Sequence, residues 1–112
     1  MKIYHNPRCR KSREGLAFLE QNRYDFAVVR YLENPLTRQE LLSIIEKLEV
    51  SPIDLIRRSE SVWKENFKGK TLSDQELVEA MLQFPKLMER PIVVHNERAI
   101  IARPAERIKD IL

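Results

Sequence analysis

The sequence predicts an α/β fold that opens with a strand–helix–strand unit. Ile3 and Tyr4 are strong β-formers within a short strand at residues 2–5, and a helical pattern of apolar residues begins near Arg10. Residues 26–31 (FAVVRY), rich in β-branched and aromatic side chains, predict a second strand. Two strands joined by one helix within about thirty residues indicate a parallel pair with a right-handed crossover.

The last quarter of the chain predicts a strand–strand–helix unit. Residues 92–95 read as a buried strand, Asn96-Glu97 as a tight turn, and residues 98–102 as an antiparallel partner strand. Pro104 is placed to begin a final helix. The two units together predict a four-stranded mixed sheet of the thioredoxin-like fold, with the loop after the first strand at its carboxyl edge, where open α/β sheets bind ligands.

A helical insertion is expected between these two units, over about residues 37–88 of a single domain spanning residues 1–112. Capping patterns at Thr37 and Ser73 mark two helix starts, and Ser51-Pro52 marks a third. Residues 59–70 read as a short helix or irregular segment that carries Trp63 and Phe67.

Composition favours a soluble globular protein, since 43% of the 112 residues are hydrophobic and 33% are charged. There is no apolar run long enough to span a membrane and no signal peptide, so we expect a cytoplasmic location without membrane contact. One cysteine and two histidines are too few for a structural zinc site, so no metal is expected. The net charge of +3 suits an anionic small substrate or an acidic partner. Basic and acidic residues are interleaved, which argues against direct nucleic-acid binding. No apolar stripe is left over for self-association, so we expect a monomer.

Cys9, the only cysteine, lies in HNPRCRKSRE (residues 5–14), where the first strand leads into the first helix. Helix amides and nearby cations favour a thiolate, and the thiolate is the nucleophilic form of cysteine. The sequence suggests that the cations of this run, Arg8, Arg10, Lys11 and Arg13, supply much of that effect. Free cysteines are often buried and inert, but no apolar sequence neighbour would bury this one.

Two neighbours of Cys9 have candidate roles in the loop. Ser12 can turn its hydroxyl back toward the sulfur. His5 can act as a base for the thiol or anchor the loop by a hydrogen bond, and anchoring is favoured because the cations already promote ionisation.

Three further arginines are candidate ligands for an oxyanion, because a guanidinium donates two parallel hydrogen bonds. Arg57 follows an apolar stretch, whereas Arg90 and Arg103 each precede a proline at a strand terminus. Surface solubility is the competing interpretation of each. The Arg90-Pro91 bond could be cis, although pattern alone favours trans.

The segments HNPRCRKSRE, LIRR (55–58), RPIVV (90–94) and the final RP (103–104) resemble the glutaredoxin-coupled arsenate reductase family. The resemblance covers nearly the whole chain and implies a thioredoxin-like fold with a helical insertion. It implies that Cys9 is the nucleophile and that Arg57, Arg90 and Arg103 bind arsenate. Family members more often carry a small residue where Arg10 stands, and fuller arsenate reductases have a longer C-terminal tail.

His5, Ser12 and Arg13 match family positions that support the thiolate loop. The implied reaction begins with attack of Cys9 on arsenate. Glutathione, as co-substrate, then reduces the adduct, and glutaredoxin regenerates the enzyme; no tightly bound cofactor is implied. Thioredoxin-coupled arsenate reductases use several cysteines of their own, so the single cysteine excludes them.

Two other functions remain open from the sequence. One is a general monothiol oxidoreductase that acts on glutathione-mixed disulfides. The other is a regulator similar to the Spx proteins, which share the fold and bind RNA polymerase. Many of those regulators use a Cys-x-x-Cys switch, whereas Ser12 occupies the second position here.

Overall fold

The computed structural model describes all 112 residues, which form two compact units. The first unit comprises Met1–Asn34 and Arg90–Leu112, and the second comprises Pro35–Glu89. The expected insertion at 37–88 lies within the second unit. The expectation that the whole chain acts as one domain remains a prediction.

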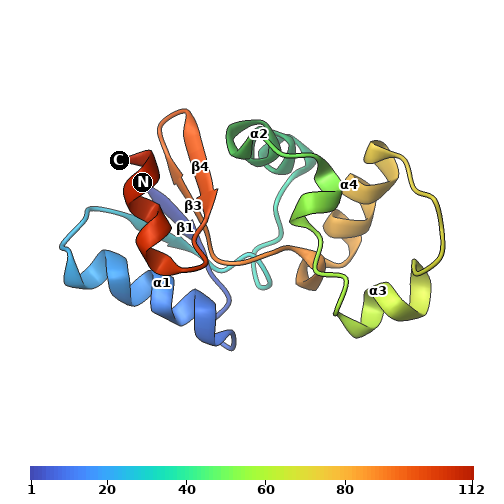
Figure 1. Ribbon diagram of the computed structural model, residues 1–112, viewed down its shortest axis with the longest axis horizontal. Coiled ribbons are helices and arrows are strands. Elements are labelled where there is room, and N and C mark those ends of the chain that lie inside the picture. Colours follow the sequence, from blue (N-terminus) through green and yellow to red (C-terminus); the bar gives the residue numbers. More distant parts are fainter. The chain divides into compact units, whose positions relative to one another are not determined.

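The first unit holds a four-stranded mixed sheet with the order β2-β1-β3-β4 (Figure 1). Its strands are β1 (Lys2–Tyr4), β2 (Ala27–Val29), β3 (Ile92–His95) and β4 (Arg98–Ile101). β1 pairs in parallel with β2 and antiparallel with β3, and β3 pairs antiparallel with β4. The predicted α/β class and four-stranded mixed sheet are therefore confirmed.

Helix α1 (Arg10–Gln21) makes the crossover from β1 to β2. Its buried positions are Ser12, Gly15 and Leu19, and this spacing of three and four residues places them on one face. Leu19 joins a core formed with strand and C-terminal residues, whose other buried members are Ile3, Val93, Ala102, Ile108 and Ile111. Ile108 and Ile111 lie in the 3₁₀ helix η3 (Ala105–Ile111), the red C-terminal segment of Figure 1, and Ala102 directly follows β4.

The second unit is helical. Its elements are α2 (Arg38–Leu48), η1 (Pro52–Leu55), α3 (Ser61–Asn66), α4 (Asp74–Gln83) and η2 (Pro85–Leu87). Thr37 and Ser73 form complete capping boxes with Glu40 and Glu76, as predicted. The buried face of α4 includes Leu77, Val78 and Met81, and a β-bridge joins Ile56 to Met88.

Three local features differ from expectation. The helix start at Ser51-Pro52 leads to a single 3₁₀ turn, and the C-terminal helix is also 3₁₀. The Arg90-Pro91 bond is cis, against the trans form that the pattern favoured, and the Arg103-Pro104 bond is cis as well. None of the helices combines the length and apolar character needed to span a membrane.

Candidate active site

Cys9 occupies the N-cap of α1, where the chain changes from extended to helical backbone (φ −94°, ψ 122°). The residue is partly exposed and its thiol is free. Arg13 donates its backbone N–H to the Cys9 carbonyl, 3.0 Å away, so the first turn of the helix closes over this residue. Amide groups at a helix N-terminus have no intrahelical acceptor, so they are available to an anion at the cap.

The Cys9 sulfur accepts hydrogen bonds from amides of this first turn. Burial raises the pKa of the Cys9 thiol, but hydrogen bonds from the Ser12 backbone and the Arg90 side chain outweigh it. The charge of Arg90 and a hydrogen bond from the Lys11 backbone act in the same direction, so the pKa lies below its ordinary value. A lowered pKa increases the thiolate fraction at neutral pH, and the thiolate is the nucleophilic form of cysteine.

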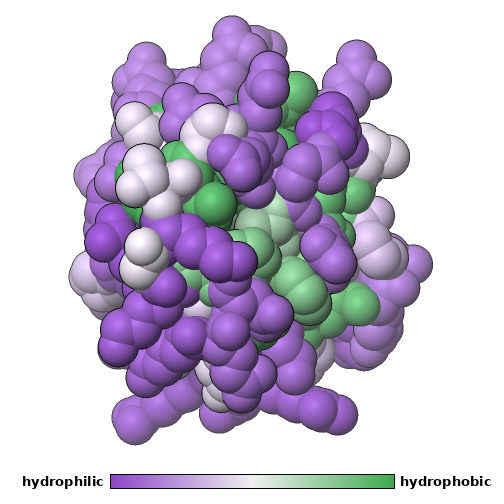
Figure 2. All heavy atoms as spheres, turned by 90° about the vertical axis from the view of Figure 1, so that its right-hand side faces the viewer, coloured by the Kyte–Doolittle hydropathy of each residue, from purple (hydrophilic) through white to green (hydrophobic).

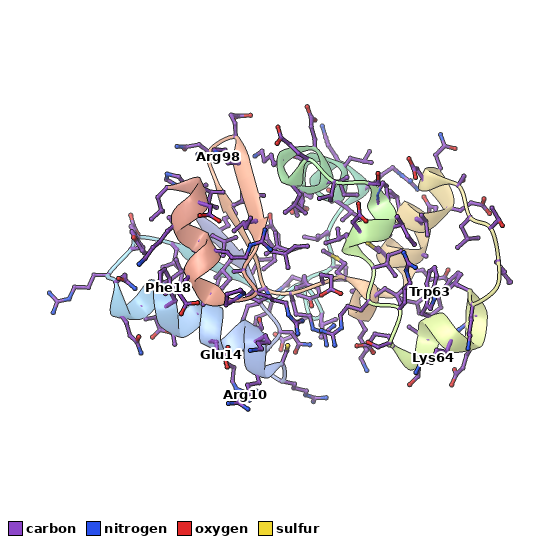
Figure 3. The ribbon with its side chains drawn as sticks, in the orientation of Figure 1. Arg10, Glu14, Phe18, Trp63, Lys64 and Arg98 are labelled. Carbon is purple, nitrogen blue, oxygen red and sulfur yellow. The ribbon has the colours of Figure 1, made fainter.

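The source of this effect differs from the sequence-based expectation. Arg10 and Lys11 direct their side chains to Glu14, with N···O distances of 3.4 Å each. Figure 3 shows Arg10 and Glu14 on the same end of α1. Arg13 donates from Nη1 to the Pro7 carbonyl, 2.9 Å away. Three of the four neighbouring cations, Arg10, Lys11 and Arg13, therefore direct their side chains to other groups. The charge that lowers the pKa of Cys9 comes from Arg90, which is distant in sequence.

A buried hydrogen-bond network lies behind the thiol. His5 is 3% exposed and Ser12 is fully buried, with His5 Nδ1 2.7 Å from Ser12 Oγ. The Asn6 backbone N–H also donates to Ser12 Oγ, at 2.9 Å. The Ser12 hydroxyl thus connects His5 to the backbone of the loop, while the Ser12 backbone N–H donates to the Cys9 sulfur. This arrangement supports the anchoring role for His5 over that of a base.

The surroundings of His5 favour its neutral form. Burial lowers the pKa of His5, and the charge of Arg30 lowers it further. A neutral imidazole adds no positive charge beside the sulfur, so thiolate stabilisation comes from amides and Arg90.

Arg90 and Arg103 lie together beside the sheet. Arg90 is buried (8% exposed), and Arg103 Nη1 donates to the Arg90 carbonyl at 3.3 Å. Between them in the sheet, Ala102 donates its backbone N–H to the Pro91 carbonyl at 2.9 Å, which ties the two cis-proline segments to each other. Two guanidinium groups and the helix amides are the donor types that bind tetrahedral oxyanions.

Comparison with known proteins agrees with this geometry. Residues 4–111 match the ArsC family. The chain belongs to the ArsC family. The family assignment confirms the resemblance stated from the sequence and spans the Cys9 loop, both cis-proline segments and the helical unit.

Several ArsC relatives align over the full chain. The E. coli (strain K12) "Uncharacterized protein YfgD" is 46% identical over 100% of this chain and 96% of its own. The "Arsenate reductase" of Neisseria meningitidis serogroup A is 39% identical over 100% of this chain and 97% of its own. The solved structure of "Arsenate reductase from Vibrio cholerae" superposes with a TM-score of 0.92 at 42% identity, covering 100% of this chain and 98% of that one.

Most of the predicted site residues of this ArsC protein lie in the first unit, and one, Arg57, belongs to the second. Cys9, His5, Ser12 and Arg90 form one connected group in the first unit, with Arg13 and Arg103 attached through backbone carbonyls. Arg57 belongs to the second unit, where its Nε lies 3.4 Å from Glu60 Oε1. Arg57 Nε and Nη1 are buried and make no hydrogen bond. Its function in the site stays a prediction.

Sequence reasoning missed three residues that shape the site. Asn6 accepts the Arg8 N–H on Oδ1 (3.0 Å) and the Cys9 N–H on its carbonyl (3.0 Å), so it builds the turn that presents the thiol. The Asn6-Pro7 dipeptide predicts a turn at this place, but it does not show which groups Asn6 binds. Gly15 and Arg30 act through tertiary neighbours, and no local pattern marks them.

Proposed function

We propose that this protein reduces arsenate to arsenite with Cys9 as the nucleophile. The observation that carries the proposal is the position of Cys9 at the N-cap of α1, where α1 amides and the Arg90 guanidinium lower the pKa of its thiol. Membership of the ArsC family and relatives named arsenate reductase support the choice of substrate.

In the first step the Cys9 thiolate forms a bond to arsenic, and one arsenate oxygen takes up protons and leaves as water. The α1 amides and the guanidinium groups of Arg90 and Arg103 are suited to hold the remaining oxygens. Arg57 enters the proposal through its match to the family pattern. Its Nη1 is buried without a hydrogen-bond partner, while its Nε lies 3.4 Å from Glu60 Oε1.

Reduction requires two electrons, which two thiols supply when they leave as a disulfide. The chain has one cysteine and cannot form that disulfide within itself, so external sulfur must complete the reaction. We assign glutathione as the co-substrate and glutaredoxin as the protein that frees Cys9. The proposed setting is the cytoplasm, where thiols stay reduced, with the protein acting as a monomer.

An arsenate-reduction assay with glutathione and glutaredoxin tests the proposal, with arsenite measured as the product. The wild-type protein is expected to form arsenite, and Cys9→Ser to form none. Arg103→Ala and Arg57→Ala are each expected to raise the KM for arsenate. Arsenite formation by Cys9→Ser at the wild-type rate would disprove the nucleophile assignment.

A glutathione-mixed disulfide substrate is run beside arsenate, because an accessible thiolate at a helix N-terminus can also attack a disulfide. Turnover of the disulfide alone would favour a general monothiol oxidoreductase. Turnover of neither substrate would favour the regulator function.

A further inference from the structure

A hollow of about 690 Å³ opens on the second unit. None of its lining residues belongs to the Cys9 loop. Its apolar lining comes from Ile53, Trp63, Leu72 and Leu77. Trp63 is 9% exposed, and its ring stacks against Phe67 with 5.5 Å between the centroids. Figure 3 shows Trp63 between α3 and α4. The volume is in the range of sites that accept a drug-sized group or an interface side chain.

The charged side chains that line this hollow are mostly cations: Arg58, Lys64, Lys68 and Lys70 against the single carboxylate of Asp74. All four cations are exposed, and none forms an ion pair. Other cations of the same unit are neutralised, since Arg57 pairs with Glu60 and Arg38 with Glu79. The hollow therefore presents uncompensated positive charge around an apolar surface.

The turn after α3 holds two of these lysines in place. Lys68 donates its backbone N–H to the Trp63 carbonyl at 3.0 Å, and Lys70 donates to the Phe67 carbonyl at 3.1 Å. Gly69, between them, adopts a positive φ of 81°, which a glycine tolerates without strain. The backbone thus places the Lys68 and Lys70 side chains beside the aromatic pair formed by Trp63 and Phe67.

The composition of the hollow discriminates between two kinds of anion. Three of the four cations are lysines, which act as separate, hydrated point charges and do not form the rigid fork that grips one phosphate. An inorganic anion would also leave the apolar lining unused. A ligand with an apolar group and several spaced carboxylates would use both parts of the surface.

We propose that this hollow, the Trp63 hollow, docks an acidic segment of a partner protein. An aromatic or branched aliphatic side chain of that segment occupies the apolar lining beside Trp63, and flanking Asp or Glu residues pair with the surrounding cations. Figure 2 shows the face that carries α3 and α4, where hydrophobic atoms reach the surface among hydrophilic ones. This docking is separate from the chemistry proposed for Cys9 and does not depend on it.

Trp63 is the only tryptophan in the chain, so its fluorescence reports on this hollow alone. The probe is a capped peptide without tryptophan, in which two leucines are flanked on each side by three glutamates. Its titration into the full-length protein at low ionic strength is expected to change Trp63 emission in a saturable way. Raising the salt concentration should weaken binding, because the paired charges are exposed.

Two control peptides and one small anion separate the alternatives. A peptide with serines in place of the leucines should bind at least tenfold more weakly, and one with lysines in place of the glutamates should not bind. Inorganic phosphate at equal charge concentration should leave the emission unchanged. Saturable binding of phosphate but not of the acidic peptide would overturn the proposal in favour of a small-anion site.

The double variant Lys64→Glu/Lys68→Glu is expected to abolish peptide binding, while its circular dichroism and arsenate turnover stay at wild-type values. The matched control, Arg98→Glu/Arg107→Glu, changes the net charge by the same amount at exposed sites of the first unit. This control should still bind the peptide, with only the small loss of affinity that the change in net charge causes. Equal loss of binding in both double variants would show that only the overall charge matters, and it would overturn the proposal. Absence of peptide binding by the wild-type protein would also overturn it.

Discussion

Gly15 of α1 lies so close to Pro91 that a Cβ atom at position 15 would stand 2.7 Å from Pro91 Cγ. Real Cβ atoms essentially never show so short a contact, and the neighbouring atom belongs to a proline ring, which moves less freely than the end of a flexible side chain. The absence of a side chain thus sets how closely α1, with Cys9 at its N-cap, approaches the segment that carries Arg90. The position of the helix and the activation of the thiol are coupled through this contact.

Gly15→Ala is therefore expected to lower the free energy of unfolding. Alanine normally stabilises a helix interior by about 1 kcal/mol relative to glycine. Here the added methyl group overpacks the contact with Pro91, which typically costs about 1–3 kcal/mol. Urea denaturation measures the change. Gln21→Ala, at an exposed position of the same helix, is the control and should be nearly neutral. A more stable Gly15→Ala protein would show that α1 can shift without cost.

Arg90→Gln is expected to raise the pKa of the Cys9 thiol, because it removes both a hydrogen bond and a positive charge from the sulfur. The rate of alkylation at neutral pH should fall several-fold. Arg10→Gln is the matched control, since Arg10 is close to Cys9 in sequence but pairs with Glu14 and is 85% exposed. An equal fall in both variants would restore the local-charge explanation that the sequence suggested.

Ser12→Ala should separate the structure of the loop from the activation of the thiol. The variant deprives His5 Nδ1 and the Asn6 N–H of a buried partner, and each such loss costs about 1–3 kcal/mol. The backbone amide of residue 12 still reaches the sulfur. We expect a clear loss of stability in urea with a smaller change in thiol reactivity than Arg90→Gln causes. Ser59→Ala, at an exposed position, is the control and should leave the stability unchanged. An unchanged stability of Ser12→Ala would show that the hydrogen bonds to His5 and Asn6 do not stabilise the fold.

His5 should make the stability of the fold depend on pH in the weakly acidic range. Its folded-state pKa is lowered, so the unfolded chain binds more protons as the pH falls below about 6.5. The contribution of neutral His5 is present above that pH and is lost as the pH falls through the lowered pKa. Urea unfolding measured from pH 7.5 to 5 should show this decline in wild-type protein.

His5→Gln should flatten that decline, whereas His95→Gln should preserve it, because His95 lies at the end of β3 and takes no part in the hydrogen bond between His5 and Ser12. A decline of equal steepness in wild-type protein and His5→Gln would assign the effect to other groups.

Local hydrogen bonding explains what the sequence predicted well. The capping boxes at Thr37 and Ser73 join residues three apart, so the sequence alone fixes those helix starts. Cys9 could be placed because the strand-to-helix transition is visible in the pattern. The α/β class followed from strand and helix periodicity, which does not depend on distant contacts.

The errors involve contacts between distant segments. Arg90 reaches Cys9 because β1 and β3 are antiparallel neighbours, which places residue 90 beside the start of α1. The charge pattern along the chain could credit only the sequence neighbours of Cys9, which are Arg8, Arg10, Lys11 and Arg13. The cis Arg90-Pro91 bond and the close contact of Pro91 with Gly15 likewise belong to tertiary packing. The 3₁₀ turns at η1 and η3 share their capping residues with α-helices, so the pattern could not tell the two apart.

The reactivity of the single thiol tests the central claim most directly. Alkylation rates of native protein with iodoacetamide, measured from pH 4 to 10, give the thiol pKa without interference from another cysteine. We expect a midpoint below the ordinary cysteine value of about 8.5, and a higher midpoint in Arg90→Gln. A midpoint at or above the ordinary value in wild-type protein would contradict the claim, because Cys9 would then rest as an unactivated thiol.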